Sequence, residues 1–586
     1  MFFTFLLTTF FVEVTGGGID GRVCAFGDIN KDRYTDIIVQ IDNYLKINLQ
    51  TERGAFISSP DLAPIDVGLP VNVQCVVGDF NGDAAPDILV SKKSLMKVNQ
   101  YETAVYISHN SAFKKVALNA AYFDQPIVVD LNGDGISDIL GFVYDDQDEV
   151  KPFCVTGSRT LSESTKGTNC SDYFQNLEKT APFTPIHGFP PIFADLDGDL
   201  SSELVFGMED KTDILRFDVW KRNGAKTWDY DGKILGRNPL NSNFKYFGGA
   251  VVGDIDANGL LDVMVPVCRE EECQHVDNML LWTKKRGWNC INLDLKGHEI
   301  VGEPESKVLF RIGDFNLDGY PDLIASLLNP TQKRIHPMIL ENVRSSDVPN
   351  ITRTFELQTN PLRLEPTDMA NGDIKMATFF DLKENGGLDI IVEYEHLLQM
   401  KHDFIRCENK GDTTFLKVQT FTSVCANDCP GHDGKLGSGI SWHGACTRFS
   451  MADTWGETKQ SAQCQMPQTS HRSLALPYVL FGLGRSPNFV DKITLGSPQY
   501  PERKGEAQKI VPNSRLVVIP PEFPSGTKWT FRQYIIPSRL LIQSLPVFAA
   551  LCVLLSSLIV FLHYREVRED RKERQMETNR FHFDAL

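Results

Sequence analysis

Residues 130–138 read DLNGDGISD and lie between two apolar stretches. Acidic or amide side chains stand at positions 1, 3, 5 and 9 of this segment, and glycine stands at position 6. Six further segments follow the pattern, with first residues 51, 51, 65, 59, 60 and 67 positions apart along the series: DINKDRYTD (28–36), DFNGDAAPD (79–87), DLDGDLSSE (195–203), DIDANGLLD (254–262), DFNLDGYPD (314–322) and DLKENGGLD (381–389). Such repetition predicts a tandem array with one supersecondary unit per repeat.

The side chains of these loops suit calcium, which takes six to eight oxygen ligands at about 2.3–2.6 Å. An EF-hand would place a bidentate glutamate at position 12, where these loops hold residues such as Val39 and Phe206. The acid stands at position 9 instead, so the loop is of another kind. We predict a structural calcium ion in about six loops, with ligands Asp28, Asn30, Asp32, Asp36, Asp79, Asn81, Asp83, Asp87, Asp130, Asn132, Asp134, Asp138, Asp195, Asp197, Asp199, Glu203, Asp254, Asp256, Asn258, Asp262, Asp314, Asn316, Asp318 and Asp322.

The seventh loop departs from the pattern because Lys383 occupies position 3. A lysine ammonium at this place can stand in for the ion. We therefore predict that the loop from Asp381 to Asp389 binds calcium weakly or not at all.

Short apolar stretches such as Val73 to Val77 flank the loops and predict β-strands. Each loop is then the turn of a hairpin, and the repeat length leaves room for two more strands. Four-stranded units arranged radially form a β-propeller. The sequence predicts an all-β protein with a seven-bladed propeller over residues 20–424. The alternative, that each acidic turn is merely a solvated hairpin loop, fits one copy better than seven copies in register.

The repeats resemble the FG-GAP, or integrin-α-like, repeat over roughly residues 20 to 420, and the stretch from Phe247 to Ala250 reads FGGA. The resemblance implies calcium loops in a seven-bladed propeller. It implies no particular ligand, because one architecture serves many functions.

Two apolar segments predict the cellular compartment. Residues 1–16 resemble a secretory signal peptide, although they lack a basic first region. Residues 540–562 carry no charge and are long enough to cross a bilayer core of about 30 Å. Basic residues follow from Arg565 onward, which predicts a single-pass type I protein of the plasma membrane with a cytosolic tail at 563–586.

The cysteines agree with this topology. Thirteen are present, and twelve remain once Cys552 in the apolar segment is set aside, an even number that allows six disulfides. Close spacing favours Cys154 with Cys170, Cys268 with Cys273 or Cys290, and pairs within a group formed by Cys407, Cys425, Cys429, Cys446 and Cys464. A zinc site at Cys425 and Cys429 is the alternative. Sequons predict glycans on Asn169 and Asn350.

Residues 425–530 are rich in cysteine, glycine and proline and predict a small disulfide-bonded β domain that acts as a membrane-proximal stalk. The stretches LPYVLFGLGRSPNFVD (476–491), VPNSRLVVIP (511–520) and RFHFDAL (580–586) resemble the T-cell immunomodulatory protein family, also called linkin. This resemblance covers the whole chain. It implies a cell-surface glycoprotein concerned with adhesion and signalling between cells.

Charge supports the metal interpretation. Six bound calcium ions would change the formal net charge from −17 to −5, and no basic patch indicates nucleic acid as a partner. The tail alternates in charge, and its last residues, with Phe581, Phe583 and Leu586, form a small apolar cluster that an intracellular adaptor or cytoskeletal factor could bind.

No catalytic motif stands out, so the chain is not predicted to be an enzyme. His402 and Asp403 could form an acid–base pair, but we expect them to be surface residues. The favoured function is an adhesion or signalling ectodomain that binds a cell-surface or extracellular protein. The alternative is a calcium-dependent carbohydrate-binding or hydrolytic propeller.

Overall fold

The computed structural model describes residues 18–583 with gaps, the longest of which are 178–182, 210–214, 236–245, 346–351, 359–368, 408–412, 423–439 and 522–527. The predicted signal peptide, Asn350, Cys425 and Cys429 lie outside the described residues. The chain divides into two compact units, Met1–Tyr534 and Ile535–Leu586.

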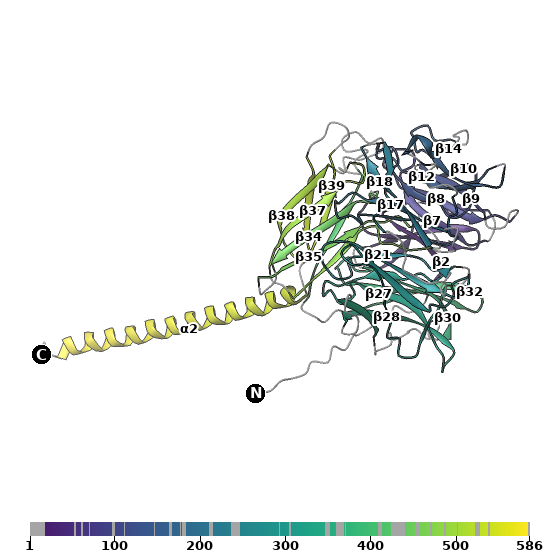
Figure 1. Ribbon diagram of the computed structural model, residues 1–586. Helices are drawn as coiled ribbons and strands as arrows, with labels where there is room; N and C mark the ends of the chain where they lie inside the picture. Colours follow the sequence, from purple (N-terminus) through teal and green to yellow (C-terminus); the bar gives the residue numbers. More distant parts are fainter. Residues whose placement is uncertain are drawn as a thin grey trace. The chain divides into compact units, whose positions relative to one another are not determined.

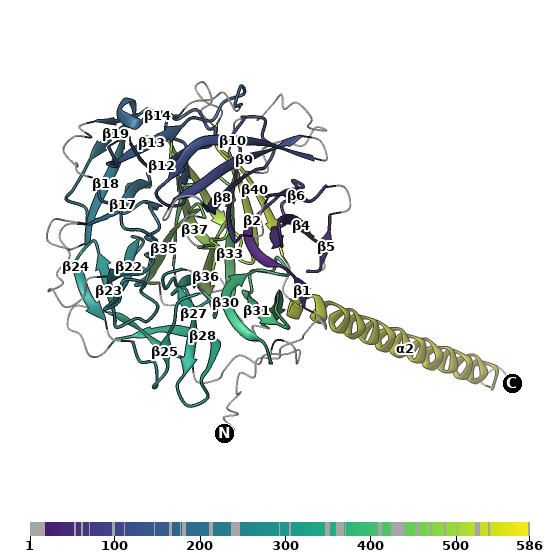
Figure 2. The same cartoon turned by 90° about the vertical axis from the view of Figure 1, so that its right-hand side faces the viewer.

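The first unit contains a ring of mainly antiparallel sheets that follow one another in chain order (Figure 2). The first three repeats form two sheets. One contains β2 (Arg22–Gly27), β3 (Asp36–Ile41), β4 (Tyr44–Gln50), β5 (Phe56–Ser58) and β6 (Ile65–Asp66). The next contains β7 (Val73–Gly78), β8 (Asp87–Lys93), β9 (Tyr101–His109), β10 (Ala112–Tyr122), β11 (Ile127–Val129), β12 (Asp138–Tyr144), β13 (Val150–Val155) and β14 (Thr168–Asn169). The second sheet spans two acidic loops because Tyr122 in β10 pairs with Val143 in β12.

Four further groups complete the ring. The first, preceded by the 3-10 helix η1 (Cys170–Asp172), contains β15 (Phe174–Gln175), β16 (Ile192–Ala194), β17 (Glu203–Glu209), β18 (Leu215–Asn223) and β19 (Thr227–Tyr230). The second contains β20 (Tyr246–Phe247), β21 (Val251–Gly253), β22 (Asp262–Cys268), β23 (Asn278–Thr283) and β24 (Gly287–Ile291), and the third β25 (Glu299–Ile300), β26 (Arg311–Gly313), β27 (Asp322–Asn329), β28 (Arg334–Arg344) and β29 (Arg353–Leu357). The last contains β30 (Asp373–Phe380), β31 (Asp389–His396) and β32 (Gln399–Ile405). All seven acidic loops connect consecutive antiparallel strands, as the sequence predicts.

The two ends of the array close the ring. Strand β1 (Ile19–Asp20) pairs with β32, with Ile19 opposite His402. Buried apolar side chains fill the space between neighbouring sheets; one cluster, for example, combines Val23 and Ile37 of the first sheet with Met376 and Ile391 of the last. Face-to-face packing of sheets around a closed ring gives a β-propeller-like fold without a long free edge.

Strands β33–β40 form a sandwich of two four-stranded sheets. One sheet has the order β36 (Val479–Gly484), β33 (Thr414–Thr420), β39 (Ser514–Ile519) and β40 (Thr530–Ile535); the other has β35 (Thr458–Cys464), β34 (Cys446–Ala452), β37 (Val490–Gly496) and β38 (Lys504–Ile510). The sandwich begins before the predicted boundary at 425, because β33 pairs with β36 and β39 rather than with a strand of the ring. It belongs to the same compact unit as the ring (Figure 1).

Four disulfides are present among the described cysteines. Three match the predicted close spacings: Cys154–Cys170, Cys268–Cys273, and Cys446–Cys464, which joins β34 to β35. The fourth, Cys24–Cys75, joins the first strands of two consecutive repeats. Cys290 and Cys407 are free, so the prediction of six disulfides is wrong for these two residues.

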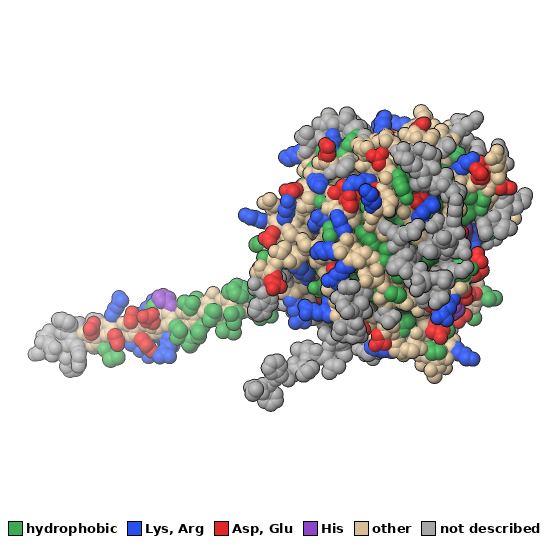
Figure 3. Space-filling model, in the orientation of Figure 1, with side chains coloured by type: hydrophobic (Ala, Val, Ile, Leu, Met, Phe, Trp, Pro, Cys, Tyr) green, Lys and Arg blue, Asp and Glu red, His purple; other side chains and the backbone are tan. Residues whose placement is uncertain are grey.

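The second unit consists of the long helix α2 (Arg539–Phe583). Its segment from Ser544 onward contains a window of mean hydropathy 2.7, enough to cross a membrane. Apolar side chains cover the first part of α2 and charged side chains the later part (Figure 3). In that later part Arg565 Nε lies 3.2 Å from Glu569 Oε1, one helical turn away.

Candidate functional site: the acidic loop face

Each acidic loop is built around the carboxylate at its first position. In the third loop, Asp130 accepts backbone N–H bonds from Gly133 at 2.7 Å and from Gly135 at 2.8 Å. Gly135 has φ of 85°, which explains the glycine at position 6. Arg33 fills that position in the first loop with φ of 72°, and its N–H bonds Asp28 in the same way. The first carboxylate therefore folds the loop around itself.

The acid at position 9 links the loop to the third strand of its repeat. Asp36 accepts the N–H of Ile29 at 2.8 Å and that of Gln50, in β4, at 2.9 Å. Asp322 likewise accepts bonds from Phe315 and from Asn342 in β28. These local bonds place the carboxylates at positions 1 and 9 close together inside the protein.

Burial without a cation is electrostatically costly for these groups. Burial raises the pKa of Asp36, Asp254 and Asp314 to about 7. For Asp262, burial acts together with the charges of Asp256 and Asp254, and its pKa lies well above the usual range. A divalent cation among these oxygens would favour the ionised forms.

Two loops bring three carboxylates together in the geometry of a metal site. Asp195, Asp197 and Glu203 offer ligand atoms within 4.8 Å of one another, and so do Asp254, Asp256 and Asp262. Several buried oxygens of the loops have no hydrogen-bond partner among the described residues: Asp28 Oδ1, Glu203 Oε1, Asp256 Oδ1 and Asp262 Oδ1. Oxygens of this kind fit a calcium ion as ligands.

Amides and carboxylates at positions 3 and 5 lie nearer the surface. Asn132 Nδ2 donates to Asp134 Oδ2 at 3.0 Å, and the first, second and sixth loops have equivalent bonds. In the fourth loop a lysine reaches this rim, because Lys221 Nζ lies 2.7 Å from Asp199 Oδ2 and also pairs with Asp197. Each of these repeats therefore has one loop in which the predicted ligand side chains lie together.

The sandwich covers the ends of the ring's sheets that carry the acidic loops. Six of the seven loops contact it through polar groups: Arg515 Nη1 donates to Arg33 O, Gln499 Nε2 to Asp130 Oδ2, Arg448 pairs with Asp195, Ala462 N donates to Asp254 Oδ2, Gly482 N to Asp314 Oδ2, and Lys417 Nζ to Asp381 Oδ2. On the face of the first unit seen in Figure 3, acidic and basic side chains are interspersed. No sequence signal predicts this docking, because its partners lie far apart along the chain.

Residues 465–468 and 472–478, between β35 and β36, lie in the middle of the ring, where Gln468 donates to Phe26 O and Arg472 to Val23 O. We call these residues the central segment. Arg472 Nη1 lies 2.6 Å from Glu393 Oε2, and its Nη2 lies 3.2 Å from Glu303 Oε2. Arg311 lies 2.6 Å from the other oxygen of Glu303. All four side chains are at most 7% exposed. Since they come from different sheets and from the sandwich, this ion-pair group holds several parts of the first unit together.

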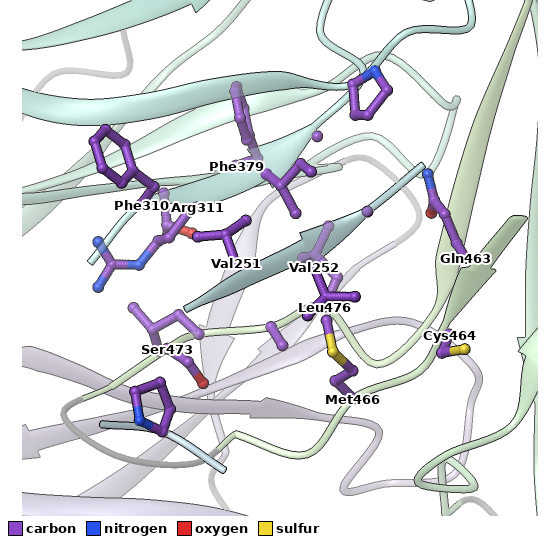
Figure 4. A pocket seen from close by; sticks show the side chains of 18 of the residues that line it. Val251, Val252, Phe310, Arg311, Phe379, Gln463, Cys464, Met466, Ser473 and Leu476 are labelled. Atoms are coloured by element: carbon purple, nitrogen blue, oxygen red, sulfur yellow. The ribbon is translucent and has the colours of Figure 1, made fainter. Parts of the chain in front are cut away.

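A cavity of about 150 Å³ remains beside this segment. Figure 4 shows Val251 and Val252 of β21, Phe379 of β30, and Met466 and Leu476 of the central segment around it. Among its lining residues the one formal charge is that of Arg311, so the cavity offers apolar contacts and no carboxylate pair.

His402 and Asp403 are not surface residues, contrary to the prediction. Both are buried, and the His402 Nδ1 lies 3.0 Å from Gly21 O in the strand pair that closes the ring. Their burial where the ring closes gives both residues a structural role.

The opposite ends of the sheets carry a group of exposed apolar side chains. Leu397 and Leu398 form the turn between β31 and β32 and are 83% and 92% exposed. Leu95 and Tyr44 are also exposed, at the corresponding second-to-third-strand connections of the two repeats that follow around the ring. We call these four residues the apolar rim.

The raised pKa values of the loop carboxyls predict that the stability of the metal-free protein depends on pH. In metal-free protein, the melting temperature is expected to rise by a few degrees when the pH falls from about 8 to about 6.5. The folded state holds protons on carboxyls such as Asp254 that the unfolded state releases, so stability is lost as the pH rises through about 7. Buried His443, with its pKa lowered to about 4, opposes this trend only at lower pH. Added calcium should flatten the dependence, and a melting temperature that falls between pH 8 and 6.5 without metal would contradict this account.

Comparison with known proteins gives relatives over nearly the full length. The chain is 39% identical to "Protein linkin" of Caenorhabditis elegans, with 97% of this chain and 95% of that protein covered. It is 27% identical to the human "T-cell immunomodulatory protein", with 98% and 94% covered. The family model described as "ITFG1, C2 domain" matches residues 437–534, within the sandwich. Among solved structures, that of BBS1N in complex with ARL6DN aligns with 68% of this chain and 95% of its own, at 10% identity and a TM-score of 0.34.

Proposed function

The chain belongs to the linkin and T-cell immunomodulatory protein family, and we propose that it is an adhesion or signalling glycoprotein of the plasma membrane. In this proposal the ring is a seven-bladed propeller of the FG-GAP type, and α2 spans the membrane once. The basic residues after the apolar part of α2, beginning with Arg565, support a type I orientation with a cytosolic tail. The tail would bind an intracellular adaptor.

We further propose that six of the loops hold structural calcium ions. The orphaned buried oxygens of Asp28, Glu203, Asp256 and Asp262 support this proposal, as does the convergence of three carboxylates in two loops. When bound, calcium would neutralise the crowded carboxylates and keep the loops in the shape that the sandwich contacts. Its role is then to stabilise rather than to recognise.

The position of the apolar rim carries the proposal for partner binding. The chain's own sandwich covers the acidic loops, so a large protein partner has access to the other ends of the sheets. Leu397 and Leu398 both have positive φ, 52° and 63°, in a tight turn where Asn-Gly is the favoured pair. Two leucines that are strained and exposed are costly for folding alone, and burial against a partner would offset this cost. We propose that the apolar rim contacts an apolar protein surface on a neighbouring cell.

A cell-mixing assay with the full chain tests this proposal. Cells that display the chain are mixed with labelled cells that do not, and mixed aggregates are counted. The double change Leu397→Asn, Leu398→Gly should reduce aggregates at least tenfold, since it removes the apolar contacts while giving the turn its preferred residues. Phe489→Asn, at an exposed apolar residue of the sandwich, serves as the matched control and should leave the count unchanged.

Equal surface levels of the variants show that folding is intact. Full aggregation by the double variant would overturn the assignment of the apolar rim. Loss of aggregation after glycosidase treatment of the labelled cells, with no effect of protease treatment, would favour the carbohydrate-binding alternative.

A further inference from the structure

The seventh loop keeps the backbone of the other loops but holds a different cation. Asp381 accepts N–H bonds from Asn385 and Gly386, both at 3.0 Å, and Asp389 accepts the N–H of Cys407 at 2.7 Å. These are the bonds that shape the other loops. The first and ninth positions are thus prepared as in a metal-binding loop.

The cation comes from the sandwich. Lys417, in β33, places its Nζ 3.3 Å from Asp381 Oδ2 and pairs with the Glu384 carboxylate. Lys417 and Asp381 are completely buried, and Glu384 is 6% exposed. Lysine is rarely buried so fully unless its charge is compensated, so these carboxylates are its counter-ions.

Further contacts complete the surroundings of the ammonium. The Tyr478 ring lies with its centroid 3.6 Å from the Lys417 Nζ, a cation–π contact, and its hydroxyl accepts the Asp381 N–H at 3.3 Å. Arg515 Nη1 lies 3.7 Å from Glu384 and supplies a second positive charge. Lys417, Tyr478 and Arg515 all come from the sandwich or the segment that leads into it, whereas the carboxylates come from the ring.

This loop does not fit calcium. Its third position lacks an oxygen ligand because Lys383 stands there, and the ammonium of Lys417 already contacts the first ligand. A lysine ammonium does contact the first ligand, but it belongs to Lys417 and not, as predicted, to Lys383. Lys383 is half-buried and acts on Asp389 through its charge, while Lys417 makes the direct contact.

We propose that the seventh loop is a cation site permanently occupied by the Lys417 ammonium, which fastens the sandwich to the ring at any free calcium concentration. A tethered cation cannot diffuse away. The site therefore needs no metal, even where the other loops do, and the proposal holds whether or not those loops bind calcium.

The test uses the full chain in detergent and measures hydrogen exchange of β33 in chelator and in calcium. Lys417→Met removes the charge at nearly constant side-chain length, and β33 should exchange at least tenfold faster than wild type in chelator. Lys417→Arg, the charge-conserving control, should retain most of the protection. Wild type should protect β33 equally in both conditions.

A double variant guards against simple misfolding. Lys383→Asn with Lys417→Met restores an oxygen at position 3 and vacates the loop, so it should bind one more calcium ion than wild type and regain β33 protection in calcium but not in chelator. Equilibrium dialysis counts the ions, with Lys383→Asn alone as the matched control. Unchanged exchange in Lys417→Met, or an equal ion count in wild type and the double variant, would overturn the proposal. If the other loops bind no calcium, the count would rise from zero to one, so the two proposals can fail separately.

Discussion

Arg472→Met is expected to destabilise the first unit by about 3–5 kcal/mol, because it leaves the buried Glu393 carboxylate without its cation and leaves Glu303 with Arg311 alone. Arg472 contacts Glu393 through both of its carboxylate oxygens and Glu303 through one, and it also donates to Val23 O. Methionine fills a similar volume, so the loss of charge pairing should dominate. The expected result is a marked fall in the denaturation midpoint of the solubilised chain, followed by tryptophan fluorescence.

A matched control separates charge pairing from the loss of any cation. Lys504→Met, at an exposed residue of β38, should change the midpoint little. Adding Glu393→Gln to Arg472→Met should recover part of the loss, because the unpaired charge of Glu393 is then removed as well, while Glu303 stays paired with Arg311. An Arg472→Met midpoint equal to that of the Lys504→Met control would show that the central ion pairs do not hold the unit together.

The loops could be predicted from sequence because their chemistry is local. Asp130, Gly135 and Asp138 interact within nine residues, and hairpin geometry follows from the same stretch. The disulfide Cys24–Cys75 carried a usable signal too, since its separation of 51 equals the spacing of the first two loops. Residues one repeat apart occupy equivalent places in neighbouring sheets.

The docking of the sandwich could not be predicted in this way. Arg472 lies 79 residues from Glu393 and 169 from Glu303, and nothing near any of the three indicates the others. Residues 414–420 read TFLKVQT, which fits one more strand of the ring, but β33 pairs in parallel with β39 about a hundred residues later. The choice between two sheets is made by long-range packing, which local periodicity does not encode.

Removal of calcium is expected to have the largest effect of all, if the six loops bind it. A ligand that binds the folded state alone stabilises it by about 2.7 kcal/mol at a hundred times its Kd, and several sites act together. Without the ions, carboxylates such as Asp254, Asp256 and Asp262 are left crowded within 4.8 Å. We expect chelation to lower the melting temperature of the solubilised chain by more than ten degrees, and readded calcium to restore it.

Magnesium gives the matched control, because its strict octahedral geometry suits these loops poorly. It should restore little of the lost stability.

Hydrogen exchange would locate the effect within the first unit. Strands β35 and β36 bond directly to loop carboxylates, through Ala462 to Asp254 and Gly482 to Asp314, so their amides should lose protection in chelator. Strand β33 should stay protected, because Lys417 supplies its cation from within the chain. Loss of protection in all three strands would mean that the lysine anchor fails without metal. An unchanged melting temperature would instead show that calcium does not stabilise the loops and that their backbone hydrogen bonds alone hold them.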